Sequence, residues 1–502
     1  MLARKVLGAL VALTLFGNAP GAQSFTVLVH NVENLFDVDG VSLYDDYQPE
    51  SYTSGHLRTK LLNTAELLAR FDGGRGPDIV LLQEVEIDHT PASGRMAPDE
   101  FLRRYTQKTV TELLAQSPLP AGLAGLPAEL WLLKALEDRG LTGYAVVSGS
   151  DPGPAREAGS TRSIKCVTLT RLPVRAVRQY PLRDARHILE VELEVAGARL
   201  FVFNNHWKSG AGDPELEKIR VENARVLRQR IDALLAEDPH TDIIIGGDFN
   251  AHYNQHLRYP EMRETGVNHV LRAQGNELAI RGRGRDLYNL WFELPPDERG
   301  SDIYQGEWGT LMQLIVSRGL YDYRGVQYVD NSFGLHRIPG LSVDAAGAPV
   351  RWEAGGPTGR GFSDHLPIHA RFTVVTDQQP DRWLALTRPA QGETRAEPRR
   401  VDYSGADLAA LALSPDSLPP DANLHDGSWN GRLFRIDADV VPDRHPRVRV
   451  RGQEFEVYGV SDAVRDPLHE QRRRGRMSFY GELGTFKGRW QFVVRDVSWV
   501  QP

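Results

Sequence analysis

Short runs of apolar residues, each followed directly by polar side chains, recur along the first three quarters of the chain. Runs of this length without alternation predict strands that are buried on both faces. The polar residues then fall where these strands end. The five polar clusters are His30–Asp37 after Phe25–Val29, Gln83–Glu84 after Ile79–Leu82, Asn204–Ser209 after Leu200–Phe203, Gly246–Asn250 after Ile243–Ile245, and Gly361–Pro367.

Longer segments with apolar residues at helical spacing lie between these runs. The predicted helical segments are Leu57–Phe71, Glu100–Leu114, Ala128–Leu136 and Asp213–Leu235. Strands that alternate with helices predict an α/β fold for this part of the chain.

The last quarter of the chain has an all-β pattern. The predicted strands are Leu433–Val440, Val448–Val460, Met477–Leu483 and Trp490–Trp499, and Gly484–Gly488 is predicted to form a hairpin turn. The spacing resembles an OB-fold, a small β-barrel that often binds single-stranded nucleic acid or oligosaccharide. We therefore expect a small C-terminal all-β barrel.

The composition is 41% hydrophobic and 25% charged over 502 residues, which is typical of a globular protein with two or three domains. Residues 1–22 contain Arg4 and Lys5, then an apolar stretch and small residues, the pattern of a secretory signal peptide. An uncleaved anchor is the alternative. The remaining predicted divisions are an α/β domain over 23–376, a linker over 377–425 and the β domain over 426–502.

The signal peptide predicts a secreted or periplasmic protein. No other segment is long and apolar enough to span a membrane, so we expect no membrane insertion. Cys166 is the only cysteine, so the chain has no internal disulfide. Oligomeric state has no signal in the sequence.

The five polar clusters, in this order and spacing, resemble the endonuclease/exonuclease/phosphatase superfamily. This superfamily includes pancreatic deoxyribonuclease, abasic-site endonucleases, bacterial sphingomyelinases and inositol polyphosphate phosphatases. The resemblance extends from about Phe25 to Phe372. It implies a four-layer α/β sandwich, in which two packed sheets are flanked by helices and the site lies at one edge.

A phosphodiester resists attack by water because its anionic oxygens repel the nucleophile, and a divalent cation neutralises that charge. We predict Glu84 and Asp364 as metal ligands, with Asn31 as a neutral oxygen ligand or water-holder. By resemblance, Glu33 extends the same site. A sparse oxygen-rich ligand set favours Mg²⁺ or Mn²⁺, with Ca²⁺ as a further candidate.

The remaining clustered residues are predicted to act on water and phosphate. Asp248 and Asn250 alternate at a strand end, so they share a face and together orient an attacking water. The glycines before Asp248 are expected to let a ligand approach the backbone. His206 and His365 are expected to hydrogen-bond the phosphoryl oxygens, with His365 as the base in an alternative assignment. Taken singly, each of these residues also fits a surface charge, a turn or a half-buried histidine.

Substrate contacts are less sharply indicated. Lys165 interrupts an apolar run, so it faces either the phosphate site or an edge. Arg447, Arg449 and Arg451 alternate with valines and are expected to line one strand face, in a C-terminal region with more basic than acidic residues. The aromatics Phe479, Tyr480, Trp490 and Phe492 either stack bases or form the barrel core. The net charge of −7 excludes a general positive field that attracts nucleic acid.

One position departs from the superfamily. The strand predicted near Trp308–Ser317 normally carries an aspartate directed at the last histidine, and Met312 stands at the matching place. A thioether neither fixes the tautomer of a histidine nor stabilises its charged form. Glu307 and Asp302 are the candidate substitutes.

The sequence therefore predicts a secreted, metal-dependent phosphodiesterase that hydrolyses DNA, and in a second reading RNA, by in-line attack of an activated water. One alternative is another phosphoesterase on the same core, of the sphingomyelinase or phosphatase type. The other is a catalytically impaired nucleic-acid-binding protein, because Met312 replaces the expected aspartate.

Overall fold

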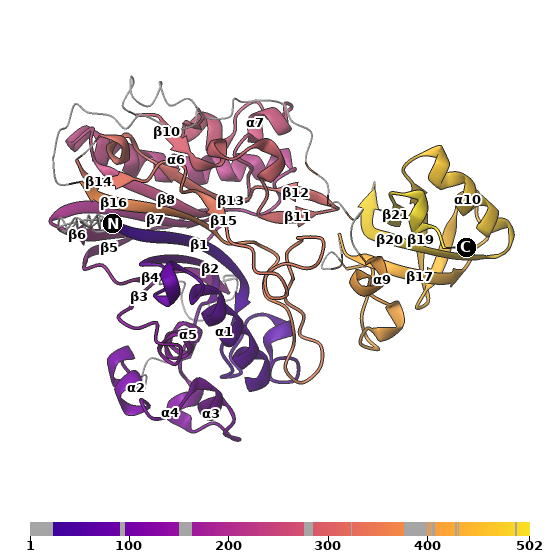
Figure 1. Ribbon diagram of the computed structural model, residues 1–502, viewed down its shortest axis with the longest axis horizontal. Helices are drawn as coiled ribbons and strands as arrows, with labels where there is room; N and C mark the ends of the chain where they lie inside the picture. The colour runs from indigo at the N-terminus through magenta and orange to yellow at the C-terminus, as the bar shows by residue number, and fades with distance from the viewer. Residues whose placement is uncertain are drawn as a thin grey trace, which may run out of the picture.

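The computed structural model shows an α/β domain and a smaller β-barrel beside it (Figure 1). The structure describes residues 24–90, 96–149, 163–275, 285–322, 324–375, 399, 401, 403, 407–426, 429, 431–486 and 489–501. The predicted signal peptide and most of the predicted linker lie outside these residues. No described helix is long and apolar enough to cross a membrane.

The first large sheet has the strand order β14–β16–β1–β2–β4–β3, with β15 paired to β16. Strands β1 and β2 are parallel, and their neighbours β16 and β4 run antiparallel to them. The strands are β1 Ser24–Leu35, β2 Ile79–Glu86, β3 Ala145–Ser148, β4 Ile164–Thr170, β14 Gly325–Tyr328, β15 Gly334–Leu335 and β16 Ile368–Val375.

The second large sheet has the order β5–β6–β7–β8–β13–β10–β9, with β7 and β8 parallel. Its strands are β5 Val174–Tyr180, β6 Ile188–Val195, β7 Ala198–His206, β8 Asp242–Asp248, β9 Ala273–Gln274, β10 Leu287–Asn289 and β13 Met312–Val316. A separate hairpin is formed by β11 (Asp302–Tyr304) and β12 (Glu307–Gly309).

The two sheets pack face to face and helices cover their outer faces (Figure 1). Successive residues of β1 face opposite sides of the sheet. Val27 and Val29 point into the core between the two sheets, whereas Leu28 packs in the cluster between this sheet and α1. On the other side, Ile243 and Ile245 of β8 pack against α6. The expected four-layer α/β sandwich is confirmed.

The predicted helical segments of this domain form helices. Its helices are α1 Ser54–Leu68, α2 Pro98–Arg104, α3 Val110–Leu114, α4 Ala121–Ala124, α5 Ala128–Glu137, α6 Pro214–Glu237 and α7 Gln255–Arg258. Asp213 caps α6, because its carboxylate accepts hydrogen bonds from the backbone N–H of Glu215 and Leu216.

The C-terminal strands form a nearly closed barrel with the order β17–β20–β21–β19–β18. An antiparallel bridge between Val440 and Val448 brings the two outer strands together. The barrel elements are β17 Leu433–Asp439, β18 Arg447–Val450, β19 Gln453–Gly459, α10 Asp462–Arg473, β20 Arg476–Phe486 and β21 Arg489–Val494, and the short helix α9 Leu408–Leu411 precedes them.

Three features of the barrel differ from the prediction in detail. The segment Val448–Val460 is two strands rather than one, because the chain turns at Arg451 and Gly452, both with positive φ. Helix α10 was missed, since its apolar residues are few and its arginines resemble a loop. The predicted hairpin turn begins later, because Gly484 and Phe486 still pair with β21.

The barrel aromatics divide between core and surface. Phe479 and Phe492 are fully buried and Tyr480 is nearly so, and all three belong to the barrel core. Trp490 packs at the edge of that core, with its ring stacked on His425. The core reading is therefore correct for Phe479, Tyr480 and Phe492, whereas Trp490 is only partly buried.

The barrel contacts the α/β domain through the hairpin β11–β12. Arg495 of the barrel donates to the backbone carbonyl of Gln305 at 3.0 Å, and its guanidinium also pairs with Glu482. A second contact joins Arg432, just before β17, to Glu353 in the loop before β16. The hairpin and this loop are the segments that lead toward the polar cluster.

Candidate active site

Glu84 reaches the site from a bulge at the end of β2. The pairing of β2 with both neighbours shifts register beside Glu84, whose φ is 62°. A left-handed conformation at a non-glycine residue costs free energy and is found preferentially at functional sites. The bulge turns the Glu84 carboxylate toward Asn31 at the end of β1, whose amide donates to it at 2.9 Å.

The glycines of β8 serve packing rather than ligand approach. A Cβ on Gly246 would lie 2.7 Å from Leu81 of the opposite sheet, and one on Gly247 would lie 2.1 Å from the carbonyl oxygen of Asn205. These residues let the sheets and the neighbouring strand come close together. The expectation that they admit a ligand was therefore wrong.

Asp248 lies at the centre of the cluster. Its carboxylate accepts hydrogen bonds from the Asn31 amide at 3.0 Å and from the backbone N–H of Asn250 at 2.8 Å. The Nε2 atoms of His206 and His365 lie 3.6 Å and 3.8 Å from its Oδ2 atom. The structure thus brings four of the predicted residues around one carboxylate.

Asn250 is displaced from the strand that was predicted to carry it. β8 ends at Asp248, and Asn250 follows in a left-handed conformation with a φ of 48°. Its side-chain amide donates to the carbonyl of Trp207 at 3.2 Å. Asn250 therefore ties the loop after β7 to the loop after β8.

Glu33 is committed to the loop before β16. Its carboxylate accepts from the Arg351 guanidinium at 3.1 Å and from the backbone N–H of Trp352 at 2.7 Å. The same Arg351 lies 3.5 Å from Asp364. Glu33 thus holds a cation beside Asp364, a different use from the ligand role that the resemblance implied.

Asn31 likewise presents its amide rather than its oxygen to the cluster. Its Oδ1 atom accepts from the backbone N–H of Glu33 at 3.0 Å, while its NH₂ group bonds two carboxylates. This orientation makes Asn31 a positioning residue for Glu84 and Asp248. The predicted role of Asn31 as a neutral oxygen ligand or water-holder stays a prediction.

The electrostatics of the site separate its two histidines. Burial holds the pKa of His206 well below its usual range, and the cations Arg186 and His365 lower it further. Burial also disfavours the charged form of His365, but the carboxylates around it, Asp364 and Asp248 foremost, raise its pKa to about 9. At neutral pH His206 is therefore neutral and His365 is a cation.

The carboxylates of the site are buried, which disfavours their charged form. Burial raises the pKa of Glu84, and the neighbouring Asp364 carboxylate raises it further. Burial and Asp364 also raise the pKa of Glu33, to about 7. Such a group of buried carboxylates gains from a bound cation.

Asp302 is a buried carboxylate whose charge acts on His365. Met312 is fully buried opposite Asp248, and its side chain belongs to the core between the sheets. Asp302, buried in β11, forms an isolated antiparallel bridge with His365 and contributes to raising its pKa. Glu307 instead points to Arg258, 3.6 Å away.

Arg186 is a site residue that the sequence argument missed. It lies just before β6, donates to the carbonyl of Trp207 at 3.4 Å, and its charge lowers the pKa of both Glu84 and His206. No carboxylate of the described residues lies within ion-pair distance of its guanidinium. Only the tertiary structure brings this loop to the cluster, so no local pattern pointed to it.

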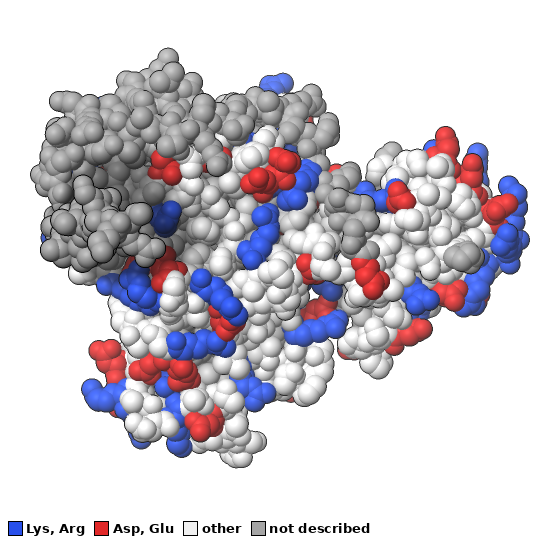
Figure 2. Space-filling model, viewed as in Figure 1, with Lys and Arg blue, Asp and Glu red and all other residues white. Residues whose placement is uncertain are grey.

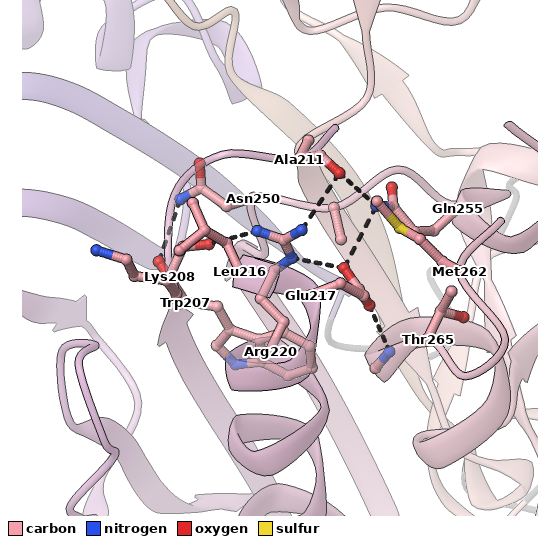
Figure 3. Close-up of polar contacts among 12 residues, drawn as sticks. Trp207, Lys208, Ala211, Leu216, Glu217, Arg220, Asn250, Gln255, Met262 and Thr265 are labelled. Carbon is pink, nitrogen blue, oxygen red and sulfur yellow. Dashed lines mark hydrogen bonds and ion pairs between the residues drawn. The ribbon is translucent and has the colours of Figure 1, made fainter. Parts of the chain in front are cut away.

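A buried ion pair anchors the loop that follows His206 (Figure 3). Arg220 of α6 pairs with Glu217 at 2.7 Å and donates to the carbonyls of Lys208 and Gly210, each at 3.0 Å. Both charged side chains are almost fully buried. The pair fixes the backbone between β7 and α6, which borders Asn250.

The other predicted substrate contacts lie elsewhere. Lys165 pairs with the buried Glu129 at 2.8 Å, so its partner is a carboxylate rather than a phosphate. In the barrel, Arg447 and Arg449 pair with Glu454. Arg451, directly after β18, donates to the backbone carbonyls of Pro419 and Pro420. The structure therefore shows these arginines engaged within the barrel rather than as a free row. Basic and acidic residues are interspersed on the face seen in Figure 2.

The donor set fits a divalent cation. Ligating atoms of Glu84, His206 and Asp248 lie within 4.8 Å of one another. The Nδ1 atom of His206 is buried without a hydrogen-bond partner, and Glu84 is a desolvated carboxylate with further negative charge beside it. Two carboxylates and an imidazole at one strand edge can hold such an ion.

The sequence model of the Endonuclease/Exonuclease/phosphatase family matches residues 169–373. The superfamily resemblance is confirmed. The matched segment includes His206 of β7, Asp248 of β8 and His365, which lies just before β16. Members of the superfamily hydrolyse phosphoester bonds. No curated protein matches the chain.

Three solved structures illustrate the likeness. TDP2 from C. elegans is 14% identical, with a TM-score of 0.36 over 70% of this chain and 75% of that chain. The human Nocturnin catalytic domain with bound sulfate is 16% identical, with a TM-score of 0.37 over 70% and 93%. Beta toxin from Staphylococcus aureus is 13% identical, with a TM-score of 0.38 over 69% and 99%.

Proposed function

We propose that this protein is a metal-dependent phosphodiesterase that hydrolyses nucleic acid, with DNA as its principal substrate. The observation that carries the proposal is the convergence of Glu84, His206, Asp248 and His365, from four separate segments, within hydrogen-bond or ion-pair distances of one another. Packing alone does not require two histidines around a buried carboxylate, whereas phosphoester hydrolysis uses them.

In this mechanism Asp248 accepts a hydrogen bond from the attacking water, and Asn250 holds the neighbouring backbone in place. His365 is cationic at neutral pH and donates a hydrogen bond to a phosphoryl oxygen as charge develops there. Asp302 stabilises that cation. His206 is neutral, and its Nε2 atom lies 3.8 Å from Glu84 and 3.6 Å from Asp248, so it keeps the two carboxylates apart.

Glu84, Asp248 and Asp364 are the side chains that would hold Mg²⁺ or Mn²⁺, with His206 beside them. A divalent cation bound there would neutralise the negative charge of the phosphate and would lower the pKa of a bound water. Arg186 and Arg351 add two fixed guanidiniums at the rim of the site, where bidentate contacts to phosphate oxygens are strong.

The strand order of the barrel supports the OB-fold reading. β19 and β21 are parallel, and α10 lies between the third and fourth barrel strands. These features fit a five-stranded Greek-key barrel of the type that binds oligonucleotides. Export, predicted from residues 1–22, completes the proposal of a secreted or periplasmic nuclease.

The test is hydrolysis by the purified protein of plasmid DNA, single-stranded DNA, RNA, sphingomyelin and the small diester bis(p-nitrophenyl) phosphate. Each reaction is run with Mg²⁺, Mn²⁺, Ca²⁺ or EDTA, beside a His365→Ala variant. The proposal requires DNA cleavage that needs a metal and that the variant loses. Cleavage of sphingomyelin alone would assign a lipid phosphodiesterase, and no turnover would contradict the proposal.

A further inference from the structure

A cleft between the α/β domain and the barrel begins at the active site. Its volume is about 1040 Å³, and Asn250 and Asp302 line one end of it. The opposite wall belongs to the barrel strands β19, β20 and β21, including Tyr458. The hairpin β11–β12 lies between the two domains along this cleft (Figure 1).

A second cavity continues the path across the barrel. It has a volume of about 650 Å³ and lies between β19, the end of β20 and helix α10. Tyr458 and Gln491 line both the cleft and this cavity. The two hollows therefore adjoin at these two residues, and together, from Asn250 to Phe486, they are called the track.

The exposed aromatic side chains of the described residues gather on this track. Tyr304, Tyr458 and Phe486 are 59%, 48% and 58% exposed, and each lines the cleft or the cavity. Of the exposed aliphatic residues, Val460 also lines the cleft, whereas Val177 lies on β5. Large aromatic faces left in solvent along a hollow are suited to stacking against flat rings.

The charges along the track differ between its two ends. In the cleft, Arg258 pairs with Glu307 and Arg495 pairs with Glu482, and Asp213 and Asp302 also line it, so acidic residues outnumber basic ones there. The far cavity contains Arg465, Arg489, His445 and His469 against Glu456. The cleft therefore provides aromatic rings. Cationic side chains are more frequent in the cavity beside α10.

The hairpin that carries Tyr304 is fastened at its tip. Gln305 accepts a hydrogen bond from Arg495 at 3.0 Å and its side chain approaches Thr485 at 3.5 Å. A Cβ on Gly306 would meet the carboxylate of Glu482 at 2.5 Å, which shows how closely the hairpin tip packs on the barrel. Tyr304 is therefore held in position before any ligand binds.

We propose that the cleft and cavity bind a single-stranded nucleic acid segment next to the scissile phosphodiester, with its bases stacked on Tyr304 and Tyr458. This inference rests on the proposed function and adds the substrate form, single-stranded rather than duplex. The barrel forms one wall of the substrate path, and Phe486 extends the stacking surface. Stacking on aromatic side chains tolerates any base, so the track selects single strands without selecting sequence.

The test measures binding of a fluorescent twelve-residue oligothymidylate, and of the matched duplex, to the full-length protein in EDTA. Tyr304→Ala combined with Tyr458→Ala is expected to weaken single-strand binding about tenfold or more, since each stacked base contributes substantially. The double Phe variant keeps both rings and is expected to bind like the wild type. Val177→Ala, exposed on β5, is the control for loss of an exposed apolar side chain.

Hydrolysis of bis(p-nitrophenyl) phosphate, which is too small to use the track, separates this inference from the proposed function. The double Ala variant is expected to keep kcat and KM for this diester while its KM for single-stranded DNA rises about tenfold. Unchanged single-strand affinity in the double Ala variant, or equal affinity for duplex and single strand, would overturn the inference. Failure of the wild type on every phosphodiester would instead overturn the proposed function, and the binding comparison would still decide the inference.

Discussion

Met312 lies directly opposite Asp248 in the pairing of β13 with β8, and both side chains are buried. A carboxylate at position 312 would therefore adjoin the buried carboxylate of Asp248. The chain instead carries its second carboxylate on the hairpin, where Asp302 accepts hydrogen bonds from Ser301 and from the backbone of Leu311. We propose that Asp302, from a different element, takes over part of the role expected at position 312, and the impaired-enzyme alternative stays a prediction for the assay to decide.

Replacing Asp302 by Asn is expected to reduce kcat by about 10- to 100-fold, in the range found for residues that support a reacting group. The change removes one of the negative charges that raise the pKa of His365, so the alkaline limit of the kcat profile moves to lower pH. Glu307→Gln in the same hairpin is the control, because Glu307 points to Arg258. Equal pH profiles for Asp302→Asn and the wild type would refute this role.

Replacing Arg186 by Ala is expected to raise KM for phosphodiesters and lower kcat, with a combined loss in kcat/KM of about 10- to 100-fold, because a charged donor to phosphate is removed. Arg186→Lys should recover part of the activity, since a point charge remains. Arg183→Ala, nearby and 70% exposed, should leave both constants unchanged. Steady-state kinetics on the small diester make the comparison, and a KM equal to that of the wild type in Arg186→Ala would argue against the assignment.

Replacing Arg220 by Ala should lower the free energy of unfolding by about 3–5 kcal/mol, because Glu217 is left as an uncompensated buried charge. Urea denaturation measures this change. Lys218→Ala is the matched control, since Lys218 forms an exposed pair with Glu215, three residues earlier in the same helix, and its loss should cost under about 0.5 kcal/mol. A similar cost for both variants would show that burial of the Arg220 pair is unimportant.

The contribution of His369 to the free energy of unfolding should fall as the pH is lowered from about 6.5 to 4. Burial, with the nearby His336 and Arg371, lowers the pKa of His369 to about 4, so the native state keeps it neutral where the unfolded chain binds a proton. Each such histidine then costs about 1.4 kcal/mol per pH unit in this window. His369→Gln should flatten the dependence relative to the wild type, whereas exposed His445→Gln should leave it unchanged. Parallel curves for wild type and His369→Gln would disprove the linkage.

The sequence predicted the sheet-forming runs and the main helices because their patterns are local. The spacing of apolar residues in the run Ile243–Ile245, and along one face of α6, directly predicts which residues are buried. Helix α10 was missed because only Val464, Leu468 and Gln471 of its residues are buried. The division of β18 and β19 was missed because Arg451, an ordinary strand residue by type, adopts a positive φ in the turn.

The candidate site was predicted well where a side chain follows a strand and poorly where a loop folds back onto it. Glu84, His206, Asp248 and His365 meet as expected, since strand ends at one edge of a sandwich lie together. Arg186 and Arg351 have no sequence pattern, because their loops reach the site only through tertiary packing. Lys165 misled the argument, since its partner Glu129 lies on a helix whose position the sequence does not give.

The most direct test of the central claim compares hydrolysis of bis(p-nitrophenyl) phosphate by the wild type, Glu84→Gln and Glu86→Gln. Glu84 belongs to the proposed metal cluster, whereas Glu86, two residues along β2, accepts a hydrogen bond from the backbone N–H of Asp37. The account predicts a rate that depends on Mg²⁺ or Mn²⁺, that falls at least about 100-fold in Glu84→Gln and that persists in Glu86→Gln. A rate insensitive to EDTA, or an equal rate in Glu84→Gln and the wild type, would contradict it.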